Sequence, residues 1–136
     1  MIYLPDTNAW IAYLRQNNSA IVHRFGQVHP GDIALCSIVL AELLYGVHRS
    51  LPSFQAHNSA LVVQLTRSFV SLPFDDRAAD EYGRLRAHLA GIGTPIGPND
   101  SLIASIALAN GLTLVTHNVR EFGRVPSLLV EDWQGS

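Results

Sequence analysis

The stretch IYLPDTN, residues 2–8, changes abruptly from apolar to polar side chains. Its first three residues are typical of a short buried strand, and apolar residues resume after Asn8 at helical spacing. Asp6 therefore stands at the junction of a strand and a helix. A carboxylate at this point either caps the helix or belongs to a site at the end of the strand, and the stretch alone leaves both interpretations open.

The same alternation of a short apolar run with a helical pattern repeats along the chain. Apolar stripes at helical spacing follow Ser37, the expected N-cap of one helix, and Asp75, which suits the positive end of another. A further stripe closes at Asn110 and Gly111, a typical helix stop. This alternation predicts an α/β fold with a parallel sheet and right-handed crossovers. Besides residues 2–4, the expected strands are residues 33–37, 70–73, 112–116 and 128–130.

The composition indicates one globular domain that spans residues 1–136. The chain is 48% hydrophobic and 15% charged, and its length is close to the commonest domain size. It contains neither an apolar run long enough to cross a bilayer nor the pattern of a secretory signal, so we expect a cytoplasmic protein without a membrane partner. The single cysteine, Cys36, lies in an apolar run and is expected to be a buried, unreactive thiol.

All nine basic residues are arginine, and the chain contains no lysine. The absence of an ammonium group excludes the P-loop lysine and Schiff-base chemistry. It also argues against a phosphoacceptor receiver domain or an aspartyl-phosphate phosphatase, which both place an aspartate at a strand end but need a lysine beside it. The net charge of −2 gives no overall indication of a nucleic-acid partner.

Acidic residues follow several of the expected strands. Asp6 follows the first strand, Glu42 lies in the helix after the second, and Asp100 lies in the first turn of the helix that a Gly/Pro-rich loop precedes. A further polar group, residues 116–121, follows the fourth strand and contains Thr116, Asn118 and Glu121. Because sites in open α/β sheets form beyond the carboxyl ends of the strands, we expect these side chains to lie together.

Each of these residues also has an ordinary structural explanation. Asp6 can be a helix N-cap, and Asp100 can be a favourable charge at a helix start. Residues 116–118 can form an ordinary turn. Glu42 is harder to explain in this way, because its neighbours are almost all apolar and a buried acid is costly unless it is paired or coordinated.

The electrostatics of three converging acids favour a bound cation. Two unit charges about 4 Å apart repel by roughly 4 kcal/mol at an effective dielectric constant of about 20. Protonation or a bound cation relieves this repulsion. A donor set made of carboxylates, without thiols or paired imidazoles, suits Mg²⁺ or Mn²⁺. Because Mg²⁺ bridges readily to phosphate oxygens, the expected chemistry is phosphodiester hydrolysis.

The motifs in order resemble a PIN domain. They are Asp6-Thr7-Asn8, Ala41-Glu42-Leu43, Gly97-Pro98-Asn99-Asp100 and Thr116-His117-Asn118. The stretches GTPIGPNDSLIA (residues 93–104) and THNVREFGRVPSLLVEDW (residues 116–133) resemble the VapC toxins of type II toxin–antitoxin modules. This resemblance implies a three-layer α/β/α fold with a mostly parallel sheet of four to five strands. It also implies a metal-dependent endoribonuclease in which Asp6, Glu42 and Asp100 are the catalytic acids that bind the metal.

The chain departs from the family pattern at one position. Many PIN domains carry a fourth aspartate where this chain has Asn118, which puts a second metal in question and leaves a catalytically silent binding module as an alternative. Glu121 could supply the missing charge through water. The resemblance also assigns supporting roles to Thr7, Asn8 and Thr116.

The resemblance implies partners as well as chemistry. VapC-like toxins cleave structured RNA, those most similar to this chain cut initiator tRNA, and a VapB antitoxin silences them. We therefore expect a tRNA substrate, a VapB-like antitoxin, a homodimer and a hetero-oligomer with the antitoxin. Arg84, Arg86 and Arg120 are candidates for contacts to RNA phosphates, although each can equally be a solvated charge on a helix face.

Overall fold

A computed structural model describes residues 1–135 as an α/β fold built on five short strands. Every pairing between them is parallel, which confirms the predicted class of sheet. Each strand lies within or next to the run that predicted it. The strands are β1 (Tyr3–Pro5), β2 (Ala34–Cys36), β3 (Val70–Leu72), β4 (Thr113–Val115) and β5 (Val130–Glu131).

The order of the strands places β1 next to β4 in the middle of the sheet. β1 pairs with β4 and β4 with β5, while β2 pairs with β3. A single parallel bridge between Tyr3 and Ile33 joins the two groups, so the strands run in the order β3-β2-β1-β4-β5. The chain therefore moves from β1 towards one edge, returns across the sheet, and continues from β4 towards the other edge.

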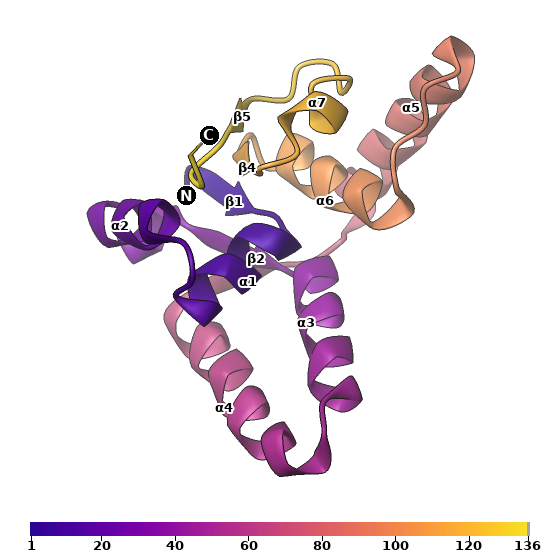
Figure 1. The fold of residues 1–136 in the computed structure, drawn as a ribbon. Helices are drawn as coiled ribbons and strands as arrows, with labels where there is room; N and C mark the ends of the chain where they lie inside the picture. Colours follow the sequence, from indigo (N-terminus) through magenta and orange to yellow (C-terminus); the bar gives the residue numbers. More distant parts are fainter. Residues whose placement is uncertain (136) are drawn as a thin grey trace.

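Right-handed crossovers then put the helices of the two halves on opposite faces of the sheet. Figure 1 shows this arrangement, with α1 to α4 on one side of the strands and α5 to α7 on the other; α3 and α4 form a hairpin that extends away from the sheet. The helices are α1 (Thr7–Arg15), α2 (Ser19–Gln27), α3 (Ser37–Arg49), α4 (Pro52–Ser68), α5 (Asp76–Ile92), α6 (Pro98–Ala109) and α7 (Val119–Phe122), with a 3₁₀ turn at Pro30–Asp32.

The helix ends confirm most of the capping predictions. Asp75 caps α5 by accepting a hydrogen bond from the Ala78 N–H, and α6 ends at Asn110, followed by Gly111 with a φ of 65°. The prediction for Ser37 is wrong by one residue. Cys36 holds the N-cap position of α3 without a side-chain bond, and the Ser37 hydroxyl instead donates to the Leu72 carbonyl of β3 at 3.1 Å.

An aromatic cluster fills the core between α1, α2 and the sheet. The Trp10 side chain is fully buried, and its ring contacts Phe25 and Phe69 edge-on, with centroids 5.2 Å and 5.0 Å apart. Such contacts anchor α1 firmly behind the end of β1, and with it the residues that begin that helix. No helix among residues 1–135 combines the length and the apolar composition needed to cross a membrane.

Candidate active site

The site lies at the point where the direction of the chain across the sheet reverses. β1 and β4 are neighbours, and the chain leaves them towards opposite edges, which opens a crevice beyond their carboxyl ends. Asp6 directly follows β1 and Thr116 directly follows β4. The Asp6 N–H donates to the Val115 carbonyl at 2.9 Å, so the parallel ladder itself fixes the backbone of Asp6.

Asp6 is a helix cap and also a buried acid. One carboxylate oxygen accepts a hydrogen bond from the Ala9 N–H at 2.9 Å and begins α1, which confirms the capping interpretation. The side chain is only 6% exposed. Burial raises its pKa, with smaller increases from the negative charges of Glu42 and Asp132, while hydrogen bonds from Thr116 and Ala9 oppose the rise. Helix capping requires only the Asp6 side chain, so it does not explain why other acids lie close to Asp6.

Glu42 reaches the same region from α3. Its Oε1 accepts a hydrogen bond from the Thr7 hydroxyl at 2.6 Å, which links the first residue of α1 to the middle of α3. The predicted supporting role of Thr7 thus has a contact in the structure. Asn8 lies beside this pair, exposed in a hollow that Glu42 and Asn99 also line.

Asp100 occupies the first turn of α6, as its position in the sequence predicts. It is half-buried, and its pKa is raised to about 6. Burial is the largest cause, followed by the charges of Glu121, Asp6 and Glu42. The structure therefore brings the three predicted acids within electrostatic range of one another, together with Glu121.

Glu121 and Asn118 form a hydrogen-bonded unit at the start of α6. The Gly97 N–H donates to Glu121 Oε1 at 2.9 Å, and the Asn118 side-chain amide donates to Glu121 Oε2 at 2.6 Å. The Thr116 hydroxyl accepts the Asn118 N–H at 2.9 Å, which continues the chain of contacts back to the end of β4. Thr116 thus lies between this unit and Asp6.

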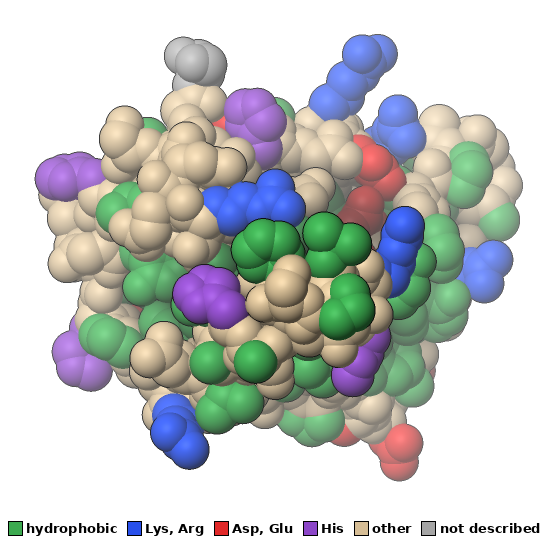
Figure 2. Space-filling model, turned by 60° about the horizontal axis from the view of Figure 1, so that its bottom comes forward, with side chains coloured by type: hydrophobic (Ala, Val, Ile, Leu, Met, Phe, Trp, Pro, Cys, Tyr) green, Lys and Arg blue, Asp and Glu red, His purple; other side chains and the backbone are tan. Residues whose placement is uncertain are grey.

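The basic residues do not neutralise these acids. Within residues 1–135, no ion pair involves Asp6, Glu42, Asp100 or Glu121. The arginines that form ion pairs bind other acids. On the face drawn in Figure 2, recessed acidic side chains are bordered by protruding basic ones.

The three arginines proposed for phosphate contacts differ in their surroundings. The guanidinium of Arg84 binds two acids of its own helix, Asp80 at 2.8 Å and Glu81 at 2.9 Å. Arg86 lies over the ring of Tyr82, and Arg120 is exposed on α7. Of the three arginines, Arg120 is nearest to the site residues in the sequence, two residues after Asn118.

The chemistry of these acids suits a hydrated divalent cation. Their donors are all oxygens, and the described residues supply no basic partner for them. No three acidic, histidine or cysteine side chains among residues 1–135 converge closely enough to enclose one bare ion. Mg²⁺ usually retains several waters and needs only one or two direct carboxylates. Acids that lie near one another without converging therefore suit hydrated Mg²⁺ better than an ion that must lose its waters.

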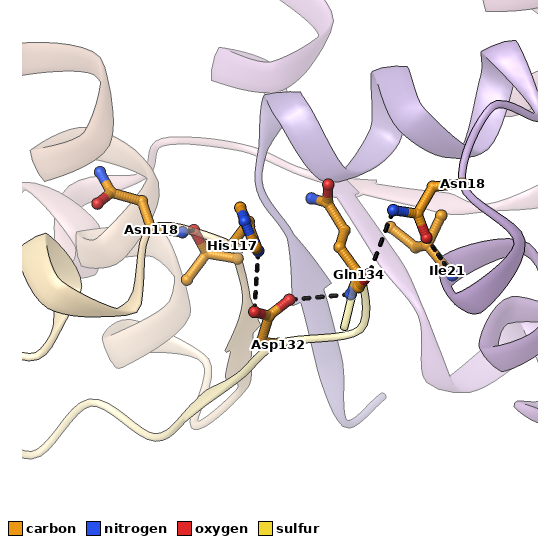
Figure 3. A network of polar contacts seen from close by, with 7 residues as sticks. Asn18, Ile21, His117, Asn118, Asp132 and Gln134 are labelled. Atoms are coloured by element: carbon orange, nitrogen blue, oxygen red, sulfur yellow. Dashed lines mark hydrogen bonds and ion pairs between the residues drawn. The ribbon is translucent and has the colours of Figure 1, made fainter. Parts of the chain in front are cut away.

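A second polar network lies beside the site and was missed from the sequence. His117 Nδ1 and Asp132 Oδ2 are 2.9 Å apart, Asp132 Oδ1 accepts the Gln134 N–H at 2.9 Å, and the Gln134 carbonyl accepts from Asn18 at 3.2 Å (Figure 3). Asp132 also contributes to the raised pKa of Asp6. Because Asp132 follows the last strand, the strand-end rule that identified Asp6 applies to it as well.

Comparison with known proteins agrees with this geometry. The family model described as "PIN domain" matches residues 3–128. The tRNA(fMet)-specific endonuclease VapC of Salmonella typhimurium is 38% identical over 96% of this chain and 97% of its own length. Ribonuclease VapC2 of Rickettsia felis is 40% identical over 98% of each chain.

Solved structures give the same result. The chain superposes with a TM-score of 0.89 on a chain of VapBC2 from Rickettsia felis bound to a DNA fragment from its promoter, at 36% identity over 98% of this chain and 99% of that one. The TM-score is 0.90 for DNA-bound VapBC from Salmonella typhimurium, at 38% identity over 98% of both chains. The chain belongs to the PIN-domain family of nucleases and, within it, to the VapC ribonucleases.

Proposed function

We propose that this protein is a Mg²⁺-dependent endoribonuclease toxin, with Mn²⁺ able to replace Mg²⁺, and that residues 1–136 form a single PIN domain. Its substrate is structured RNA, with tRNA as the class and initiator tRNA as the specific candidate. Membership of the VapC ribonucleases supports the reaction, and the 38% identity to a tRNA(fMet)-specific endonuclease supports the substrate.

One observation carries the proposal. Asp6 is a carboxylate that is 6% exposed and has no basic partner among residues 1–135, and its pKa is raised by burial and by other acids rather than lowered by a cation. An ionised group in this situation costs free energy that a bound divalent cation returns. In a structural helix cap alone, Glu42 and Asp100 would have no reason to lie nearby.

The residues have distinct roles in this proposal. Asp6 and Asp100 are the direct ligands of the ion, and Glu42, oriented by the Thr7 hydroxyl, either binds the ion or orients the attacking water. When bound, the cation polarises the phosphoryl group and lowers the pKa of a coordinated water. Thr116 supports Asp6 by hydrogen bonding, and Asn8 lines the hollow beside Glu42, where the RNA chain can lie.

The proposal extends to partners. The superposed structures from Rickettsia felis and Salmonella typhimurium are VapBC complexes bound to DNA. We propose by analogy that a VapB-like antitoxin neutralises this chain, in a hetero-oligomer built on a toxin homodimer, and that the protein acts in the cytoplasm. Co-expression with an antitoxin encoded next to this chain, followed by size-exclusion chromatography, tests the assembly.

The test of the nuclease function is cleavage of a purified tRNA panel with Mg²⁺, Mn²⁺ or EDTA. Wild-type protein is expected to cut in either metal and to be silent in EDTA. Asp6→Asn is the informative variant, because asparagine caps a helix as well as aspartate does while removing the charge. We expect it to lose cleavage while remaining folded by circular dichroism.

Asp76→Asn is the matched control, because Asp76 is an exposed acid in the first turn of α5 and takes no part in the site. It is expected to cleave at the wild-type rate. Cleavage by wild-type protein in EDTA, or undiminished cleavage by Asp6→Asn, would refute the proposed function. Mapping of the RNA ends then identifies the bond that is cut.

A further inference from the structure

Glu121 connects two segments of the site that are separate in the sequence. It lies on α7, yet its carboxylate binds the Gly97 backbone before α6 and the Asn118 side chain before α7. Gly97 is the N-cap residue of α6 and has no side chain with which to cap it. The carboxylate of Glu121 therefore supplies, from a distant part of the chain, a hydrogen-bond acceptor that the start of this helix lacks.

This arrangement places the carboxylate of Glu121 close to that of Asp100. A Cβ atom added at Gly97 would lie 3.6 Å from Asp100 Oδ2 and 4.0 Å from Glu121 Oε1, so the two carboxylates flank the same glycine. Asp100 follows Gly97 by three residues, in the first helical turn. The position of the Gly97 backbone, which Glu121 holds, thus fixes where the side chain of Asp100 begins.

Each oxygen of the Glu121 carboxylate already accepts one hydrogen bond, from Gly97 at 2.9 Å and from Asn118 at 2.6 Å. Protein donors from two separate segments therefore orient both oxygens of this carboxylate. The contacts favour a structural use of this carboxylate.

We propose, on the basis of the nuclease function proposed above, that Glu121 is a positioning residue. It clamps the start of α6 to the segment after β4 and so sets Asp100 opposite Asp6. Asn118 is the donor that completes the clamp, which explains why an amide rather than an acid is found there. What the clamp requires of residue 121 is two hydrogen-bonding atoms rather than a negative charge.

Two substitutions at the same position separate these requirements. In Glu121→Gln, the amide oxygen still accepts from the Gly97 N–H, and the amide nitrogen faces Asn118, whose own amide can turn to present its oxygen. In Glu121→Ala both bonds are lost. Replacing a group that orients a metal ligand typically costs about 10- to 100-fold in activity or metal affinity, so we expect this loss for Glu121→Ala and cleavage within about threefold of wild type for Glu121→Gln.

Substitutions at residues 118 and 121 together test whether the hydrogen bonds matter, because they exchange the donor and the acceptor of the contact between these two side chains. Asn118→Asp places two carboxylates at the 2.6 Å contact and should break the clamp at pH 8, although it restores the fourth acid of many PIN domains. Adding Glu121→Gln to it supplies an amide donor for the new carboxylate and an oxygen for Gly97. We expect Asn118→Asp to lose about 10-fold or more and the double variant to recover to within about threefold of wild type.

The Gly97 amide reports the clamp without any cleavage assay. In ¹⁵N–¹H spectra of metal-free protein, its hydrogen exchange should be slow in wild type, Glu121→Gln and the double variant, and at least about 10-fold faster in Glu121→Ala and Asn118→Asp. Calorimetric titration with Mn²⁺ should rank the five proteins in the same order. Because the exchange measurement needs neither RNA nor metal, it judges the clamp even if the proposed nuclease function fails.

Two results would overturn the inference. Equal losses in Glu121→Gln and Glu121→Ala would show that the charge of Glu121 matters rather than its hydrogen bonds. Cleavage and Mn²⁺ affinity in Asn118→Asp at or above the wild-type level would show the same from the other side. If Glu121→Ala does not fold, the comparison of Asn118→Asp with the double variant decides.

Discussion

Asp100→Asn is expected to make the metal-free protein more stable while it abolishes cleavage. The pKa of this carboxyl is raised from 3.8 to about 6 by burial and by three neighbouring acids. Between about pH 4 and pH 6, the folded protein therefore keeps a proton on Asp100 that the unfolded chain has released. Above pH 6 the carboxyl is ionised in both states, and its charge costs more free energy in the folded state, which lowers the free energy of unfolding. An asparagine of the same shape removes that disadvantage.

The magnitude follows from the rise in pKa. A rise of about two pH units, at about 1.4 kcal/mol for each, gives about 3 kcal/mol at most. Because Asp100 is only half-buried, solvent screening reduces this to about 1–2 kcal/mol. For a chain of this size the melting temperature should rise by roughly 4–8 °C at pH 8.

The sign of the effect depends on pH in a way that identifies its cause. The gain should be small near pH 3.5, where the carboxyl is mostly protonated in both states, and should grow as the pH rises from about 4 to about 7. Thermal unfolding in EDTA across this range, compared with the exposed control Asp76→Asn, measures it. Added Mg²⁺ should raise the melting temperature of wild type and leave Asp100→Asn nearly unchanged.

An Asp100→Asn protein that is no more stable than wild type at pH 8 would contradict an electrostatic cost at this site. A stabilisation at pH 3.5 as large as that at pH 8 would do the same, because its cause would then be packing rather than charge. A gain of similar size in Asp76→Asn would show a general effect of net charge and would not support a strained site.

Three further predictions follow from individual contacts. Asp6→Ala should lose about 1 kcal/mol relative to Asp6→Asn in urea unfolding, because only the asparagine keeps the bond to Ala9, and equal stability would contradict the cap. Thr7→Val should lower cleavage about 10-fold by releasing Glu42, with unchanged circular dichroism, and a wild-type rate would show that the 2.6 Å bond does not orient this acid. Burial raises the pKa of the Cys36 thiol to about 11, so iodoacetamide at pH 8 should label this residue only in denatured protein, and rapid labelling of native protein would be the contrary result.

The strands and the main acids could be predicted because they depend on local patterns. Short apolar runs indicated all five strands, and an acid after an apolar run indicated Asp6. α2 was not predicted, because only Ile21 and Phe25 are buried in it and its composition is otherwise mixed. The error at Ser37 has a similar origin, since a serine before a helix resembles an N-cap even when its hydroxyl bonds to a neighbouring strand.

The clamp at Glu121 could not be predicted, because its partners are defined only by the fold. Its contact with Gly97 spans 24 residues and uses a backbone N–H, which leaves no trace in residue type. The sequence placed Glu121 near the site and suggested a charge acting through water. The contact to Asn118, in contrast, spans only three residues, and an amide before a short helix with an acid in its first turn is a pattern that could have suggested it.

Calorimetric titration of Mn²⁺ into folded protein at pH 7.5 tests most directly whether Asp6, Glu42 and Asp100 form a site that requires a divalent cation. We predict saturable binding to wild type and to Asp76→Asn, and its loss in Asp6→Asn and Asp100→Asn while all four proteins remain folded. Absence of binding to folded wild-type protein, or equal binding to all four, would contradict the account.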